Sequence, residues 1–470
     1  MKVDTVIVGA GTAGLSALRE VRRFTEDVLL VNDGHWGTTC AAVGCMPSKA
    51  LIEAANGFHR RHDFDRFGIR GSGALSADIP AVLARVRALR DDFVKGPEAV
   101  PGKLGDRALA GRARLAGPGA IEVDGRRIEA RAIILAPGSR PIVPAPWRGF
   151  GDRILTSDTL FEQPDLPRRI AVIGLGAIGV ELAQALARLG LKVAGFDAAG
   201  TLAGIDDANV LAALHPLIAA EFPVHLGAEA TLEDAGSAIR VIAGDATFDA
   251  DAVIAAIGRR PNLEGLGLET LGVPLDDHGM PPLDPETLRI GDTCVFLAGD
   301  ANGKRPLLHE ALDEGFLAGR NATAREPHDS CRRIPLRIVF SEPQIAVVGR
   351  SFADLAQEKF IAGSVDFENQ SRAIIAGVND GLLKVYVDPQ SARILGSEMA
   401  VPAAEHLAHL LALCIQREMT VFDLLRMPFY HPTVEEGLRS ALRDAARRVS
   451  QPQTEAGTAY CEICPEPPLR

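Results

Sequence analysis

The chain has 470 residues, of which 47% are apolar and 24% charged, an ordinary globular composition that excludes a fibrous or disordered protein and leaves room for about three domains. Its 61 acidic residues outnumber its 50 Lys and Arg, giving a net charge of −11, which argues against nonspecific binding to nucleic acid or to an anionic membrane surface. Seven scattered cysteines do not suit a secreted disulfide framework, and no apolar run reaches the roughly 18 residues of a membrane span. We therefore expect a cytoplasmic protein.

The N-terminus carries an apolar run that leads into a glycine-rich turn. We predict a strand over residues 5–8, a helix after the turn and a second strand over residues 28–31. The turn has the spacing of dinucleotide-binding βαβ units, with Gly9, Gly11 and Gly14. A helix N-terminus offers unpaired N–H groups, and glycine lets a pyrophosphate approach the backbone, so this unit predicts a nucleotide site. Asn32 stands where the ribose ligand is expected.

Two closely spaced cysteines follow this unit. Cys40 and Cys45 lie five positions apart, in a segment that ends at Lys49, and we expect them at the start of a helix. Such a pair can close a small reversible disulfide, and a helix N-terminus lowers a thiol pKa from about 8.5. The pair therefore predicts thiol–disulfide exchange rather than two inert buried thiols.

The middle of the chain repeats the strand–glycine–helix pattern. A hairpin around Asp124-Gly125 and a buried strand ending at Gly138 precede a strand over residues 170–173. A second glycine turn follows, with Gly174, Gly176 and Gly179, and its second strand ends at Asp197. A carboxylate there binds both ribose hydroxyls and repels a 2′-phosphate, and residues 198–201 contain no arginine, so the second unit favours NAD(H).

The last third of the chain changes character. Further buried strands end at Gly258 and before Asp300, whereas the sequence after Pro335 alternates strands and then predicts helices over residues 403–416 and 434–448, a separate α+β domain. Chemistry with cysteine sulfurs needs a proton donor and acceptor near neutral pH, which suits histidine. His431 is our candidate, because Pro432 shapes its turn and Glu436 can orient it.

These motifs together resemble the flavoprotein disulfide reductases, the family of dihydrolipoyl dehydrogenase, glutathione reductase and mercuric reductase. The resemblance covers nearly the whole chain in family order, through the two glycine turns, the segment 37–49, Ala136-Pro137-Gly138, Gly258-Arg259-Arg260-Pro261-Asn262, Ala298-Gly299-Asp300 and His431-Pro432-Thr433-Val434-Glu435-Glu436. It implies an α/β protein with two Rossmann-like dinucleotide-binding domains and a C-terminal α+β dimerisation domain. The expected boundaries are 1–145 for the first part of the FAD-binding domain, 146–264 for the NAD-binding domain, 265–333 for the central FAD-binding part, 334–448 for the dimerisation domain and 449–470 for a flexible tail.

The resemblance also implies cofactors and roles. FAD is expected at Gly9, Gly11, Gly14, Asn32, Lys49, Gly138 and Asp300, and NAD at Gly174, Gly176, Gly179, Asp197 and Gly258. Cys45 is expected against the flavin and Cys40 toward the substrate sulfur, while Lys49 pairs with Glu181 near the flavin's reactive nitrogen. In the family, the histidine at His431 reaches the active site of the other subunit, so an obligate homodimer is implied.

Among family members, the sequence favours dihydrolipoyl dehydrogenase. Pro47-Ser48-Lys49 resembles the form found in that enzyme, and Asp197 agrees with NAD. The expected substrate is lipoamide or another small disulfide, including one carried on a lipoyl-bearing protein domain, and no resident metal, nucleic acid or membrane partner is expected. Two alternatives stay open: an NADH-dependent disulfide or mercuric-ion reductase, and a non-catalytic flavin-bearing subunit or redox sensor.

Some positions depart from the family pattern. Asn32 replaces the ribose carboxylate, and further replacements that can alter flavin binding or potential are Thr38, Ala42 and Pro137. The C-terminal tail adds a second close pair, Cys461 and Cys464. It can relay electrons outward from the first pair, stay an inert exposed pair or bind a metal with a partner's ligands; truncation before Ser450 tests the relay.

Overall fold

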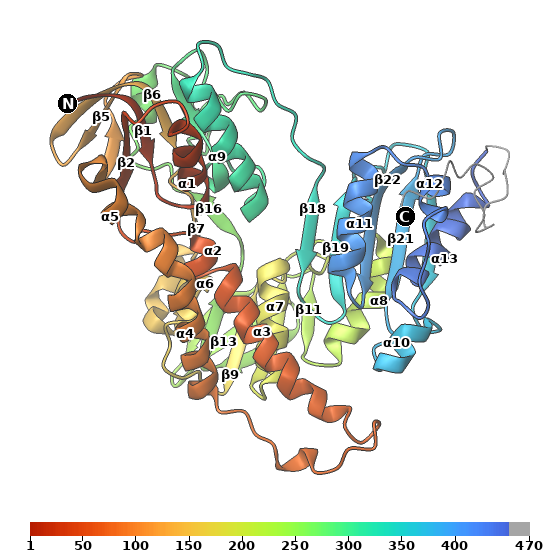
Figure 1. The fold of residues 1–470 in the computed structure, drawn as a ribbon. Coiled ribbons are helices and arrows are strands. Elements are labelled where there is room, and N and C mark those ends of the chain that lie inside the picture. The colour runs from red at the N-terminus through yellow and green to blue at the C-terminus, as the bar shows by residue number, and fades with distance from the viewer. Residues whose placement is uncertain (451–470) are drawn as a thin grey trace.

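The computed structural model describes residues 1–450, and its three largest sheets lie in separate parts of the molecule (Figure 1). The N-terminal sheet runs in the order β3-β2-β1-β6-β5-β4, with β17 also pairing with β6. Its strands are β1 Lys2–Val8, β2 Val28–Asn32, β3 Ala108–Ala110, β4 Ala113–Leu115, β5 Ala120–Val123, β6 Arg126–Leu135 and β17 Val295–Leu297. β1 pairs in parallel with β2 and β6, so the first βαβ unit is formed as expected.

β6 corrects one expectation from the sequence. The second strand of the hairpin expected around Asp124-Gly125 and the buried strand expected to end at Gly138 form one continuous strand, which ends at Leu135. Its first half alternates between exposed and buried residues, because it pairs with the antiparallel β5, and its last four residues are all buried between parallel neighbours.

Two helices cover one face of this sheet, and four other α-helices lie in the chain between β2 and β3. α1 Thr12–Val21 packs against α9 Leu308–Thr323, and both contact β6. The short α2 Thr39–Ala42 leads into α3 Cys45–His59, which packs on α4 Ile79–Glu98 and on α7 of the next unit; α5 Val100–Leu104 returns the chain to β3. Contact of α3 with both units brings the cysteine segment to their junction.

The second sheet is parallel and runs β11-β10-β9-β15-β8. Its elements are β8 Ile154–Leu155, α6 Ser157–Leu160, β9 Arg169–Ile173, α7 Ala177–Arg188, β10 Lys192–Asp197, α8 Ala208–Ala219, β11 Val224–Leu226 and β15 Ala252–Ala255. A small antiparallel sheet lies against it, made of β12 Thr231–Ala235, β13 Ala238–Ala243 and β14 Ala246–Ala250. The ribbon of β7 Ser139–Pro141 and β16 Arg259–Pro261 connects the two glycine-turn units.

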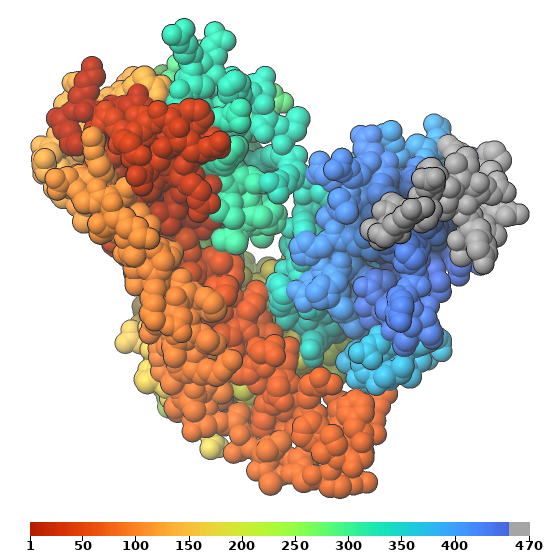
Figure 2. Space-filling model, viewed as in Figure 1, coloured from red at the N-terminus to blue at the C-terminus, as the bar shows by residue number. Residues whose placement is uncertain are grey.

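The C-terminal part is an antiparallel sheet in the order β18-β19-β22-β21-β20 with helices packed on it. Its elements are β18 Leu336–Val339, β19 Gln344–Gly349, β20 Ile361–Asp366, α10 Ser371–Ala376, β21 Leu382–Val387, β22 Ile394–Val401, α11 Ala404–Gln416, α12 Val421–Leu425 and α13 Glu435–Ala446. Figure 2 shows a deep notch between this part and the N-terminal part. None of the helices in residues 1–450 is long and apolar enough to cross a membrane.

A buried ionic network fastens the second unit to the C-terminal sheet. The Lys384 Nζ lies 2.7 Å from Oδ2 of Asp207, which caps α8, and the Tyr386 hydroxyl donates to the same oxygen at 3.0 Å. Glu398 accepts the Asp207 backbone N–H at 3.0 Å. All four side chains are at most 9% exposed, so these mutually paired polar groups join the two parts.

Candidate active site

The first and third glycines of each turn allow close backbone packing. A Cβ on Gly9 or on Gly174 would lie 2.2 or 2.4 Å from a carbonyl oxygen after the neighbouring strand, and both glycines have positive φ. A Cβ on Gly14 or on Gly179 would lie 1.8 Å from the carbonyl oxygen of the first glycine. Any larger residue at these four positions would separate the helix from the sheet.

The middle glycines have open space instead. Gly11 and Gly176 cap the N-termini of α1 and α7, and a Cβ on either would meet nothing within 4 Å. Neither helix start has a side-chain cap, so the N–H groups there are free for an anion. The residues present thus fit a pyrophosphate at each turn, and the assignment of FAD to the first turn and NAD(H) to the second stays a prediction.

The two side chains expected at the riboses accept equivalent backbone N–H groups from the glycine turns of their own units. Asp197 Oδ2 accepts the Leu175 N–H at 2.5 Å, and Asn32 Oδ1 accepts the equivalent Ala10 N–H at 2.9 Å. The amide of Asn32 also donates to the His35 carbonyl at 2.9 Å, which a carboxylate cannot do. Asn32 therefore makes a second hydrogen bond, which fixes its own loop and which an aspartate could not make.

Three further residues expected at the cofactors lie along the connecting ribbon. Gly138 precedes β7 and Gly258 precedes β16, and each has a positive φ that favours glycine. Asp300 lies in a short turn after β17, where its Oδ2 accepts the Ser139 hydroxyl at 2.8 Å. Because β6 and β17 are parallel neighbours, Gly138 and Asp300 lie beyond the same edge of the first sheet.

Cys40 and Cys45 form a hydrogen-bonded pair whose pKa values are shifted in opposite directions. Cys40 lies in α2 and Cys45 begins α3, so the two thiols belong to two helices rather than to the single helix expected. The hydrogen bond from Cys40, assisted against burial by the charge of Lys49, lowers the pKa of Cys45 to about 7. The same hydrogen bond, together with burial, raises the pKa of Cys40.

Lys49 and Glu181 form the expected ion pair, between residues 132 positions apart. Lys49 Nζ lies 2.9 and 2.7 Å from the two carboxylate oxygens of Glu181. Lys49 is one turn after Cys45 on α3, and Glu181 is on α7 and only 5% exposed. The packing of α3 on α7 therefore places a charged pair beside the cysteine thiols.

His431 has the orienting carboxylate that the sequence suggested. Its Nδ1 lies 2.8 Å from Glu436 Oε2, and Glu436 also pairs with Arg439 at 2.9 Å. Burial raises the pKa of Glu436, but the hydrogen bonds from His431 and Thr433 and the charge of Arg439 outweigh it and hold that pKa below its usual value. The His431 side chain is 70% exposed, so its other ring nitrogen is open to a partner.

The histidine is remote from the cysteines of its own chain. Figure 1 shows α13, which His431 closely precedes, on the opposite side of the molecule from α2 and the start of α3. α13 packs on α12, β20 and β21. Within one chain, the expected acid–base residue and the expected dithiol are therefore two separate half-sites.

Comparison with known families matches both the N-terminal and the C-terminal parts of the chain. The model of the pyridine nucleotide-disulphide oxidoreductases matches residues 3–315, and the model of the dimerisation domain of the same family matches residues 336–442. This chain belongs to the pyridine nucleotide-disulphide oxidoreductase family. The resemblance inferred from the motifs is confirmed, as is the fold class of two dinucleotide-binding units and a dimerisation domain.

Relatives of this oxidoreductase match over nearly their full length. Dihydrolipoyl dehydrogenase of Chlamydia pneumoniae is 30% identical over 92% of this chain and 95% of its own. Dihydrolipoyl dehydrogenase 3 of Pseudomonas aeruginosa is 31% identical, with coverage of 95% and 99%. Both are similar to this chain as members of the same family.

Solved structures share the fold at lower identity. The copper(II) complex of the HOCl-induced flavoprotein disulfide reductase RclA from Escherichia coli superimposes with a TM-score of 0.82 at 20% identity, over 94% of this chain and 99% of its own. LpdA from Mycobacterium tuberculosis gives 0.80 at 24% identity, over 94% and 99%. At these identities the likeness concerns the fold alone.

Family membership and the two glycine turns identify the class of enzyme. The protein is an FAD- and NAD(H)-dependent disulfide oxidoreductase, as the sequence predicted. Its dimerisation domain supports a homodimer.

Two residues of the site were not predicted from the sequence. Phe340, just after β18, donates its N–H to Glu181 at 2.9 Å, and its ring lies 4.6 Å from Lys49 Nζ. Glu314, buried on α9, accepts the Gly299 N–H at 2.6 Å and so holds the turn that carries Asp300. Burial raises the pKa of Glu314 even though Asn302, Gly299 and Arg332 oppose the shift. The sequence of α9 does not single out Glu314, because Glu310 and Asp313 lie on the same helix.

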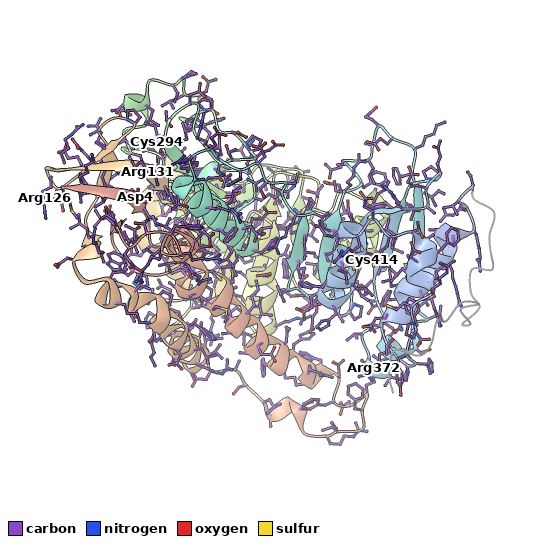
Figure 3. The ribbon with its side chains drawn as sticks, turned by 45° about the horizontal axis from the view of Figure 1, so that its top comes forward. Asp4, Arg126, Arg131, Cys294, Arg372 and Cys414 are labelled. Atoms are coloured by element: carbon purple, nitrogen blue, oxygen red, sulfur yellow. The ribbon has the colours of Figure 1, made fainter. Side chains whose placement is uncertain are left out.

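The remaining cysteines within residues 1–450 lie apart from the pair. Figure 3 shows Cys294 near Arg131 at the N-terminal end and Cys414 in the C-terminal part. The Cys294 thiol donates to the Pro118 carbonyl at 2.8 Å, and burial raises the pKa of Cys414 to about 11. Cys331 is exposed. The second expected pair, Cys461 and Cys464, lies outside the described residues.

Proposed function

We propose that this oxidoreductase catalyses the reaction dihydrolipoamide + NAD⁺ → lipoamide + NADH + H⁺. The observation that carries the proposal is the Cys40–Cys45 pair at the junction of α2 and α3, next to the Lys49–Glu181 ion pair. Full-length similarity to dihydrolipoyl dehydrogenases at about 30% identity supports it. When bound, FAD supplies the two-electron carrier between the dithiol and the nicotinamide.

The opposite pKa shifts of the two thiols favour different roles for the two sulfurs. In the oxidised protein, Cys40 and Cys45 form a disulfide, and one substrate thiolate attacks Cys40 Sγ. The Cys40–Cys45 bond breaks and Cys45 leaves as the thiolate, because a thiol of lower pKa is the better leaving group. Lys49 stabilises that negative charge. The second substrate thiolate then attacks the sulfur bound to Cys40, which closes lipoamide and releases the reduced pair.

Proton transfer accompanies the second attack. Cys40 has a raised pKa and leaves as a poor thiolate, so it needs a proton as the mixed disulfide breaks. We assign that proton, and the removal of protons from the incoming thiols, to His431 of the partner subunit, oriented by the Glu436 of its own chain. Separation of the two half-sites in one chain supports this assignment.

Reduction kinetics test the proposal. The purified protein is mixed in a stopped-flow instrument with dihydrolipoamide, NADH or NADPH, and flavin absorbance is followed. We expect rapid reduction by dihydrolipoamide and by NADH, and slow reduction by NADPH because Asp197 disfavours a 2′-phosphate. Turnover of oxidised acceptors is then surveyed. Failure with lipoamide, together with good rates on another disulfide, would overturn the substrate and leave the disulfide oxidoreductase.

A further inference from the structure

The segment that follows β18 connects the dimerisation domain to the flavin-side ion pair. Phe340 N–H donates to Glu181 Oε1 at 2.9 Å, and the Phe340 ring centroid lies 4.6 Å from Lys49 Nζ. One residue therefore contacts both members of the Lys49–Glu181 pair, through its backbone and through its side chain.

Two residues farther on, the segment is anchored to the same helix that carries Glu181. Glu342 N–H donates to Gln184 Oε1 at 2.8 Å, and Gln184 Nε2 donates back to the Glu342 carbonyl at 2.7 Å. Arg188 Nη1 reaches the Glu342 carboxylate at 2.5 Å. Glu181, Gln184 and Arg188 are all at most 5% exposed. The position of Phe340 is thus held by buried contacts along α7.

The ring acts on a partly exposed side chain that is also held by its ion pair with Glu181. Lys49 keeps 34% of its side-chain surface exposed, and a lysine ammonium on its four-carbon stem reorients readily toward water. The negative face of an aromatic ring attracts an ammonium ion and shields it from solvent. The ring and the Glu181 carboxylate together restrict the ammonium to one place.

We propose that Phe340 is a positioning residue that holds Lys49 where its charge acts on the Cys45 sulfur. The inference rests on the proposed function for the roles of the cysteines, but its geometry does not depend on the substrate. The groups that face Cys45 are Cys40 from α2, Lys49 from its own helix α3 and Glu181 from α7. Of these, Lys49 stabilises the thiolate and Glu181 opposes it, so displacement of the ammonium shifts the balance toward the protonated thiol.

The test is the pH dependence of Cys45 alkylation in the full-length, flavin-bound protein. After reduction with dithiothreitol and its removal, iodoacetamide is added between pH 5.5 and 9, and Cys45 modification is measured by mass spectrometry. In Phe340→Leu we expect the alkylation midpoint to rise by about half a pH unit or more. Phe340→Tyr keeps the ring and restores the wild-type midpoint. Circular dichroism verifies folding, and Phe340→Met replaces the Leu variant if that variant does not fold.

A matched control is available in the same domain. The Phe352 ring lies 5.9 Å from Lys384 Nζ, and its backbone N–H donates to the buried Glu398 at 2.7 Å. Phe352→Leu removes a similar ring–lysine contact far from the cysteines and should leave the midpoint unchanged. Lys49→Met should raise the midpoint, and Phe340→Leu should add nothing in that background, because Phe340 acts through Lys49.

Two results would overturn the inference. One is an unchanged midpoint in a folded Phe340 variant, and the other is a shift that persists in the Lys49→Met background. Failure to turn over lipoamide would instead overturn the proposed function and leave this test intact, because alkylation needs no substrate.

Discussion

Cys40 and Cys45 have the same side chain but different surroundings. Cys45 begins α3, accepts a hydrogen bond from Cys40 and lies one turn before Lys49. Its pKa is lowered from 9.0 to about 7, so thiolate forms as the pH rises through 7, and the stability gained from the low pKa is present above 9 and lost as the pH falls through 7. Cys40 stays protonated over this range.

The first prediction concerns the hydrogen bond between the two thiols. In Cys40→Ala, the Cys45 alkylation midpoint should rise from near pH 7 by about one pH unit, because the thiolate loses its donor. Cys40→Ser retains a donor and should stay closer to the wild type. Equal midpoints in the two variants would show that the hydrogen bond does not lower the pKa.

At the scale of single elements, the two glycine turns have the same geometry and are predicted to bind different cofactors. Gly11 and Gly176 have ordinary φ angles of −78° and −68°, and a Cβ on either meets no protein atom within 4 Å. Alanine therefore fits the protein at both positions. It does not fit a pyrophosphate that approaches the backbone there.

The second prediction separates the two sites. Gly11→Ala should fold normally but bind FAD roughly tenfold more weakly, as measured by titration of the flavin-free protein. Gly176→Ala should keep its full FAD content and show a roughly tenfold higher KM for NADH. A Gly11 variant that purifies with stoichiometric FAD and binds it as tightly as wild type would contradict the assignment of the first turn.

The third prediction concerns the packing of α1 on α9. A Cβ on Gly315 would lie 2.1 Å from the Ala13 carbonyl oxygen, so Gly315→Ala must push the two helices apart. We expect a loss of about 1–3 kcal/mol in the free energy of unfolding. Gly57→Ala on α3 is the matched control, because its Cβ meets nothing within 4 Å and alanine favours a helix by up to about 1 kcal/mol. Thermal unfolding of both variants measures the difference.

At the scale of the whole molecule, one chain holds two half-sites that do not meet. The dithiol lies at the junction of the two dinucleotide-binding units, whereas His431 and Glu436 lie at the start of α13 on the other side of the C-terminal sheet. A symmetric dimer can bring each histidine to the partner's dithiol, since a twofold interface repeats every contact. The dimerisation domain is then part of the active site.

The fourth prediction follows from this arrangement. Homodimers of His431→Gln should lose roughly 10²–10⁴-fold in turnover with lipoamide, and Cys40→Ser homodimers should be inactive. A heterodimer of the two variants, purified with different tags, should recover about half of the wild-type activity, because one of its two sites has both an intact Cys40 and an intact His431. If His431 served its own chain, every site in that heterodimer would lack one residue and no activity would return.

Local pattern was enough to predict the βαβ units, the cysteine pair and the change to an α+β domain. Glycines at Gly9 and Gly174 are needed by their own turns, and buried parallel strands are recognisable from short β-branched runs. The domain boundaries and the cofactor roles of individual residues stay predictions.

Apart from the Lys49–Glu181 pair, which the family resemblance implied, only the tertiary structure decided which distant residues meet. Phe340 reaches Lys49 across nearly three hundred positions because β18 packs beside α7, and no periodicity in the sequence encodes that contact. The hydrogen bonds of the Asn32 amide, one from the glycine turn at Ala10 and one to its own loop at His35, likewise depend on how whole elements pack, as does the burial of Glu314 under the Asp300 turn. Composition and spacing specify which chemical groups are available, whereas close packing determines their neighbours and hence their pKa values.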